Sequence, residues 1–254
     1  MNQLPRVIPC LLLKEGGFYK SVQFGQWKYV GDPTNTLRIF NDKEADEICI
    51  LDVDATREGR SPNYDLIGEM ASECFMPLSY GGGIKSFDEA SRLFDLGIEK
   101  VCLSSAVFES PGLIEKIVSV YGSQAVTGVI DVKKQLLGGY RIFTRNGKVA
   151  IPEKLVDALK RLESQGIGEI MINAIHKDGT MQGYDLDLIR QTAPQVGVPV
   201  VFCGGAGAVE HLLAAVEAGA TAVAAGSLFV FQGKHRAVLV TYPERKELIK
   251  LFST

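Results

Sequence analysis

Several acidic and amide side chains follow short apolar runs, at the places where buried strands would end. Asp131 lies near the end of "GVIDVKK", and Asp52 and Asp54 follow the run in "ILDVDATREGR". Asn173 ends another run, just before the turn "HKDGT". A carboxylate at the carboxyl end of a barrel strand is well placed for general acid–base catalysis. Asp131 is therefore the candidate catalytic carboxylate, and a helix cap or a salt bridge at the mouth is its alternative role.

Two pairs of loops combine glycine with serine in the manner of phosphate sites. Glycine lets backbone N–H groups approach an anion, a serine hydroxyl adds a donor, and a following helix directs its positive end to the same point. The predicted phosphate-binding residues are Gly83, Ser104 and Ser105 in a first site, Gly205, Gly226 and Ser227 in a second, and Asp178 and Gly179 in the turn "HKDGT". Tight turns without a ligand are the alternative. Two sites favour a small molecule with two phosphate-like groups.

Lys20 lies in one of two long, glycine-bearing segments, residues 14–34 and 132–152, which we expect to be loops that cover the mouth as lids. From such a loop, Lys20 could reach a phosphate or a substrate oxygen, so it joins Asp131 as a candidate catalytic residue. A solvated surface lysine is the alternative.

Four charged residues occur at the starts of predicted strands instead of their ends. They are Arg6, Glu47, Lys100 and Glu169, two positive and two negative. Facing inward, they would form a balanced ring at the bottom of a barrel. Buried ion pairs are costly to desolvate, so such a ring indicates a passage or a docking surface more than it indicates stability.

The elements that would position these residues alternate between strand and helix. Eight apolar runs, 6–13, 47–53, 77–80, 100–103, 125–131, 169–173, 198–203 and 222–225, are separated by amphipathic segments such as "EKLVDALKRLESQG". Eight such units predict one α/β domain, a (β/α)8 TIM barrel over residues 1–254. An open doubly wound sheet is the alternative, but it would call for a dinucleotide-type glycine turn after the first strand.

An internal repeat divides the chain into two (β/α)4 halves, approximately 1–122 and 123–254. Tyr64-Asp65-Leu66 recurs as Tyr184-Asp185-Leu186, and the "GG" and serine landmarks recur at a similar offset. The same offset relates Asp131 to Leu11 or Leu12, within a run of three leucines. Asp131 therefore lacks an acidic counterpart in the first half.

The composition limits the classes of ligand and partner. The net charge is −3, which gives no indication of a nucleic-acid or membrane partner. Five cysteines without a CxxC pair and three scattered histidines predict free thiols in a reducing cytoplasm, no metal and no other cofactor. Met1–Arg6 has no apolar segment of a secretory signal. Residues 212–231 are long enough to span a membrane, but they divide into a helix and a strand.

Many motifs together resemble HisF, the cyclase subunit of imidazole glycerol phosphate synthase, over nearly the whole chain. They include "RVIPCL", "ADEICILDVDA", "YGGGIKS", "VIDVKK", "DGTMQGYDL", "CGGAGAVEH" and "AAGSLFVF". The resemblance implies a duplicated half-barrel, two phosphate sites, and a HisH-like glutaminase docked on the N-terminal face, whose ammonia passes through the barrel. Arg6, Glu47, Lys100 and Glu169 match the ammonia gate of that family.

Two positions depart from the pattern of the family. Leu12 stands where the family has the first of two catalytic aspartates, and Ser104-Ser105 replaces Asn-Thr in the first phosphate site. The loss of an acid–base group argues against an efficient cyclase. The stretches "IPCLLLK" and "GSLFVFQGKHRAVLVTYP" look closer to the WbuZ-like side branch, which implies ammonia delivery to a sugar amidotransferase in surface-polysaccharide (LPS O-antigen) biosynthesis. A true cyclase of histidine biosynthesis and a non-catalytic scaffolding barrel are the alternatives.

Overall fold

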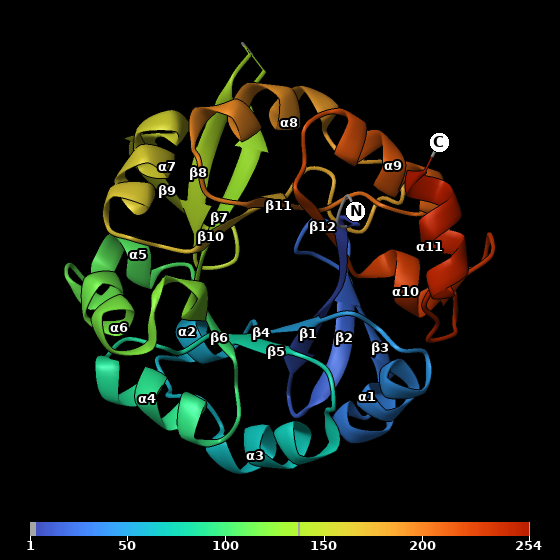
Figure 1. Cartoon of the computed structure of the whole chain (residues 1–254), viewed down its shortest axis with the longest axis horizontal. Coiled ribbons are helices and arrows are strands. Elements are labelled where there is room, and N and C mark those ends of the chain that lie inside the picture. The colour runs from blue at the N-terminus through green and yellow to red at the C-terminus, as the bar shows by residue number, and fades with distance from the viewer. Residues whose placement is uncertain (1–3, 137, 254) are drawn as a thin grey trace.

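A computed structural model of the chain describes residues 4–136 and 138–253. Within them, eight parallel strands pair in a closed ring (Figure 1). In ring order they are β1 (Arg6–Lys14), β4 (Ile48–Asp52), β5 (Leu78–Gly81), β6 (Lys100–Leu103), β7 (Val126–Lys134), β10 (Glu169–Ala174), β11 (Val200–Cys203) and β12 (Ala222–Ala225). The pairing of Arg6 with Ala222 joins the last strand to the first. The predicted (β/α)8 barrel is confirmed.

Helices surround the ring of strands (Figure 1). The longer ones are α1 (Pro33–Asp42), α3 (Tyr64–Glu73), α4 (Phe87–Asp95), α6 (Leu113–Tyr121), α7 (Leu155–Ser164), α8 (Leu186–Thr192), α9 (Val209–Glu217) and α11 (Arg245–Phe252). Single turns form α2 (Ala55–Glu58), α5 (Ala106–Glu109) and α10 (Ser227–Val230), and η1 (Ser123–Ala125) and η2 (Ala193–Gln195) are 3-10 turns. Helix α4 shows how the sequence starts a helix, because Ser86 and Glu89 form a reciprocal capping box.

The two long segments after β1 and β7 are hairpins and not the irregular loops that we predicted. β2 (Gly17–Ser21) and β3 (Trp27–Gly31) extend β1, and β8 (Tyr140–Thr144) and β9 (Val149–Lys154) extend β7. Antiparallel pairing satisfies backbone groups that a loop would leave to water. A further short hairpin joins β13 (Phe231–Gln232) to β14 (Ala237–Val238).

Apolar side chains form two separate cores. The larger core packs between the strands and the surrounding helices, and a smaller one fills the barrel interior. Four cysteines lie in the interior core, and Sγ of Cys49 is 3.8 Å from Sγ of Cys102. All five cysteines are free thiols, as predicted. The apolar residues of the interior beneath the mouth thus present sulfur and aliphatic groups.

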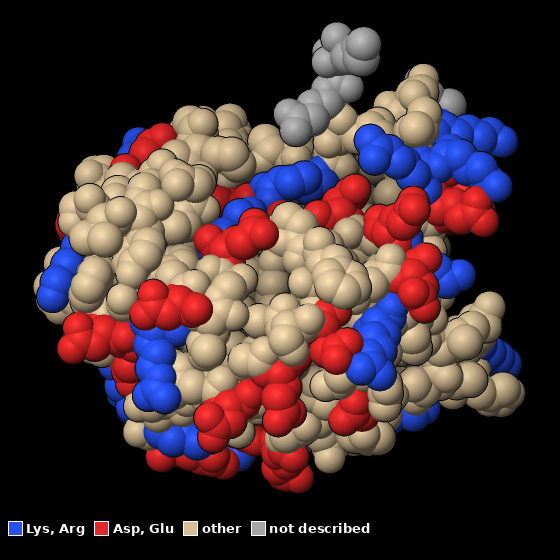
Figure 2. Space-filling model, turned by 60° about the horizontal axis from the view of Figure 1, so that its bottom comes forward, with Lys and Arg blue, Asp and Glu red and all other residues tan. Residues whose placement is uncertain are grey.

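The surface is mixed in charge. Acidic and basic side chains are interspersed over the face shown in Figure 2. None of the helices in the described part of the chain has the length and apolarity needed to cross a bilayer. Residues 212–231 form the predicted helix and strand, α9 and β12, and continue into α10 and the first residue of β13.

Candidate functional site

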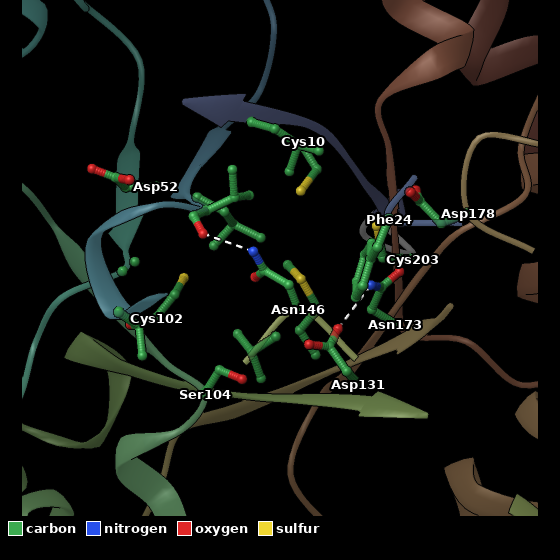
Figure 3. A pocket seen from close by; sticks show the side chains of 18 of the residues that line it. Cys10, Phe24, Asp52, Cys102, Ser104, Asp131, Asn146, Asn173, Asp178 and Cys203 are labelled. Carbon is green, nitrogen blue, oxygen red and sulfur yellow. Dashed lines mark hydrogen bonds between the residues drawn. The ribbon is translucent and has the colours of Figure 1, made fainter. Parts of the chain in front are cut away.

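A pocket opens at the carboxyl ends of the barrel strands, and Asp131 of β7 points into it (Figure 3). Asn173 at the end of β10 donates a 2.8 Å hydrogen bond to Oδ1 of Asp131. Burial raises the pKa of Asp131, this hydrogen bond opposes the rise, and the nearby charge of Asp178 adds a smaller increase; the resulting pKa is about 6. A carboxyl group with this pKa can both accept and donate a proton near neutral pH.

Leu12 lines the same pocket from β1 and is almost fully buried. Its register partner on the next strand is Leu51, whereas the register partner of Asp131 is Asn173. Each pair lies where the first strand of its half meets the second. The second half therefore presents a carboxyl–amide pair to the pocket, and the first half presents two leucines.

Asp52 also borders the pocket, but its carboxylate is occupied. Arg60 donates to both of its oxygens at 2.9 and 3.0 Å, and the backbone N–H of Ala55 donates to Oδ1 at 2.9 Å. Figure 3 shows the Asp52 carboxylate directed away from Asp131. Bidentate pairing with a guanidinium is strong and directional, and here it engages both oxygens of the carboxylate. Asp52 is thus poorly suited to replace the acid missing at Leu12.

Lys20 is buried and fixed, unlike the solvated surface lysine that was its alternative role. Its Nζ donates to Asp178 at 2.6 Å, and its side chain passes beside Gly226. The turn that carries Asp178 packs directly on β2. A Cβ on Gly179 would lie 2.2 Å from the Ser21 carbonyl oxygen, so only glycine fits there. This close approach positions the Lys20–Asp178 pair.

The second predicted phosphate site forms a small pocket around that pair. Gly205, Gly226, Ser227, Lys20 and Gly179 all line it. The Ser227 hydroxyl is buried, and none of the described residues bonds to it. A buried polar group without a partner calls for one, and a ligand oxygen would supply it. Helix α10 is only a single turn long. The groups that would donate hydrogen bonds to a ligand here are therefore backbone N–H groups, the Ser227 hydroxyl and Lys20.

The first predicted phosphate site is a wider pocket of about 400 Å³. Gly83, Ser104 and Ser105 line it, together with Arg145 at the tip of the β8–β9 hairpin. Gly83 donates its N–H to Thr56 Oγ1 at 3.1 Å and has a φ of +77°. The helix after Ser105, α5, is again a single turn. The structure therefore brings the predicted residues of each site together, on two sides of one mouth.

The four charged residues at the strand starts meet as predicted at the opposite end of the barrel. Arg6 donates to Glu47 at 2.6 Å and also pairs with Glu169, and Lys100 donates to Glu47 at 2.8 Å. Lys100 lies 3.8 Å from Glu169. Glu47 and Glu169 are nearly buried, whereas the two cations keep part of their surface exposed. The cluster closes the N-terminal end of the barrel interior.

Sequence reasoning missed the residues that the two hairpins bring over the mouth. Phe24 and Trp27 come from the β2–β3 hairpin, and Arg145 and Asn146 from the β8–β9 tip. The dipeptide Asn146-Gly147 is a turn signal that could have located this tip. No group of three or more histidine, cysteine or acidic side chains in residues 4–136 and 138–253 is arranged to hold a metal ion.

Comparison with known proteins places this site in a family. The profile of a histidine biosynthesis protein family matches residues 6–236. A Pseudomonas aeruginosa protein provisionally named imidazole glycerol phosphate synthase subunit hisF2 is 49% identical over 244 residues, which cover 96% of this chain and 97% of that protein. A protein from Leptospira borgpetersenii, provisionally named HisF of the same synthase, is 45% identical over 98% of each chain. Imidazole glycerol phosphate synthase subunit HisF of Exiguobacterium sibiricum is 37% identical over 97% of this chain and 96% of its own. The chain therefore belongs to the HisF family.

Proposed function

We propose that the chain is the ammonia-channelling subunit of a glutamine amidotransferase complex, with a HisH-like glutaminase on its N-terminal face. Two features support this proposal. The charged cluster of Arg6, Glu47, Lys100 and Glu169 closes the end where ammonia would enter. The interior above it carries neutral sulfur and aliphatic groups. An uncharged interior disfavours NH4+, which would lose its hydration, and admits neutral NH3.

The observation that carries the proposal is the pair of leucines, Leu12 and Leu51, across the pocket from Asp131. In the HisF family, the cyclase divides acid and base work between two aspartates, and this chain keeps one. General acid–base groups contribute about 10²- to 10⁴-fold to a rate. Delivery of ammonia requires a passage and no proton transfer, so it survives this replacement.

We propose further that the ammonia serves sugar amidation in surface-polysaccharide biosynthesis, in the cytoplasm. A separate amidotransferase would transfer a phosphoryl group from a nucleoside triphosphate to the carbonyl oxygen of an acetamido sugar, and ammonia would then add to that carbon and displace the oxygen as phosphate, which forms the acetamidino group. The barrel would supply only the nucleophile. The two anion sites at the mouth would bind a phosphorylated small molecule.

A second candidate function is the cyclase reaction itself. The pKa of Asp131, about 6, and the buried Lys20 in the same pocket favour retained proton transfer there. In that case, Asp131 would act as both acid and base in turn.

One assay separates the two candidates. The purified chain is supplied with an ammonium salt and the cyclase substrate, and imidazole formation is measured beside the Exiguobacterium sibiricum HisF. We expect at least a hundred-fold less product from this chain. A rate equal to that of the control would refute the channelling proposal in favour of the cyclase. Co-expression with the glutaminase is the complementary measurement, and we expect glutamine hydrolysis to rise when the two proteins bind.

A further inference from the structure

The β8–β9 hairpin belongs to the second half of the chain, but its tip lies over elements of the first half. Asn146 donates from Nδ2 to the carbonyl oxygen of Val53 at 2.8 Å, immediately after β4 (Figure 3). The neighbouring Arg145 lines both the pocket that contains Asp131 and the pocket of the first predicted phosphate site, which we call the first anion pocket. Among the described charged side chains around these two pockets, Arg145 alone borders both.

The backbone at this tip is unusual. Arg145, Asn146 and Gly147 all have left-handed φ values, +52°, +57° and +74°. Asparagine and glycine adopt this conformation readily, but arginine rarely does. A tight antiparallel turn requires left-handed φ values at its central residues, so the hairpin itself enforces this conformation. The turn fixes the backbone from which the Arg145 side chain reaches the rim of both pockets.

Among the described residues, the guanidinium of Arg145 is paired with one surface carboxylate, that of Glu109. It donates to Glu109 Oε1 at 3.1 and 3.3 Å, and about half of each side chain is exposed. Exposed ion pairs of this kind are weak and screened by salt. The other cations of the pocket are Arg57, which pairs with Asp54, and Lys85, which donates to the Gly59 carbonyl. Because its partner is an exposed carboxylate, Arg145 can turn to an incoming anion at low cost.

The second anion pocket has the reciprocal arrangement. Its cation is Lys20, which comes from the β2–β3 hairpin of the first half and pairs with Asp178 of the second. Each hairpin thus carries a cation to the glycine and serine loops of the opposite half.

We propose that Arg145 is the charged specificity residue of the first anion site, and that it exchanges Glu109 for a phosphate group of the ligand. The guanidinium fork suits the bidentate geometry of a phosphate. This inference rests on the two anion sites of the proposed function. It adds that each site is completed only when both halves of the barrel are in place.

Titration of the full chain with inorganic phosphate at low ionic strength tests the proposal, with backbone amide NMR shifts as the readout. Gly83, Ser104 and Ser105 report on the first site, and Gly205 and Ser227 report on the second. In Arg145→Gln, we expect phosphate affinity at the first site to fall about ten-fold or more, with the second site unchanged. In Glu109→Gln, we expect affinity at the first site to rise by about two- to five-fold, because the competing carboxylate is gone.

Arg141→Gln is the matched control, since Arg141 is an exposed arginine on the same hairpin and lines neither pocket. It should leave both sites as in the wild type. If phosphate shifts neither set of amides in the wild type, the anion sites of the proposed function are wrong. If it shifts both sets, and Arg145→Gln and Glu109→Gln bind as the wild type does, the sites stand and the role of Arg145 is refuted. Arg145→Lys keeps the charge without the fork, and an intermediate affinity would support bidentate binding.

Discussion

Leu12 and Asp131 occupy equivalent positions at the carboxyl ends of β1 and β7, and both border one pocket. Leu12 pairs with Tyr19 of the first hairpin and with Leu51 of β4. Asp131 pairs in the same way with Phe143 of the second hairpin and with Asn173 of β10. A symmetric scaffold thus holds an asymmetric site. One carboxyl group has a raised pKa, and its counterpart is an aliphatic side chain.

Replacing Leu12 with aspartate should restore a pair of carboxylates in the pocket. We expect Leu12→Asp to raise ammonia-dependent imidazole formation by about a hundred-fold, because a second acid–base group becomes available. The buried polar group should also lower the free energy of unfolding by on the order of 3 kcal/mol. Leu12→Asn is the control of similar shape that cannot exchange a proton. A cyclase rate that falls in Leu12→Asp would instead favour Asp131 acting alone.

The raised pKa of Asp131 predicts a specific dependence of stability on pH. The ordinary pKa is 3.8, and the folded value is about 6, so the folded state binds this proton more tightly than the unfolded state. The contribution of Asp131 to stability is therefore greatest below about pH 4 and decreases as pH rises through 6. Asp131→Asn keeps an acceptor for Asn173 and carries no charge. We expect it to be more stable than the wild type at pH 7.5, by on the order of 2 kcal/mol, with no gain at pH 4. Urea unfolding at both pH values measures the difference, and an equal effect at both would contradict the assigned cause.

Gly179 is predicted to tolerate no side chain. In Gly179→Ala, the new Cβ would meet the Ser21 carbonyl oxygen at 2.2 Å, in addition to the cost of a positive φ of +71°. We expect a loss of about 3 kcal/mol in thermal or urea unfolding, with weaker anion binding at the second site because Lys20 shifts.

Gly233→Ala is the matched control for that variant. Gly233 has nearly the same φ, +70°, and a Cβ added there would have no neighbouring atom within 4 Å. It should lose only about 1 kcal/mol, which reports the backbone conformation alone. Equal losses in the two variants would show that the contact with β2 does not matter.

Glu47 is the shared acceptor of the charged cluster at the barrel bottom. In Glu47→Gln, Arg6 and Lys100 each lose a charged partner, and we expect a loss of about 2 kcal/mol in stability at pH 7. The channelling proposal also predicts a several-fold change in the rate of product formation when the assembled complex obtains its ammonia from glutamine. The rate should not change when ammonia is added as an ammonium salt. An equal change in both reactions would mean that the cluster acts on stability alone.

The eight strands of the barrel could be predicted from short-range signals in the sequence. Apolar runs of four to eight residues, amphipathic segments between them and the glycines after them predict eight barrel strands, all of which the structure contains. Because parallel strands present their carboxyl ends at one face, the strand ends also placed Asp131, Ser104 and Ser227 at one mouth. The sequence also predicts that Leu12 replaces an aspartate. Residues 11, 12 and 13 are all leucine, so an alignment error of one residue does not change this prediction.

Contacts between distant segments were decided only by the tertiary structure. The sequence predicts loops where the structure has hairpins, because antiparallel pairing with β1 and β7 depends on a register that local composition does not specify. Lys20 and Asp178 are separated by 158 residues, and nothing near either one indicates the other. The occupation of Asp52 by Arg60 and the reach of Arg145 across the mouth are decided in the same way. The sequence determined the barrel and the residues at its rim, because those follow from local periodicity. Which side chains are paired, buried or free to meet a ligand depends on packing between the halves, and only the folded chain contains that information.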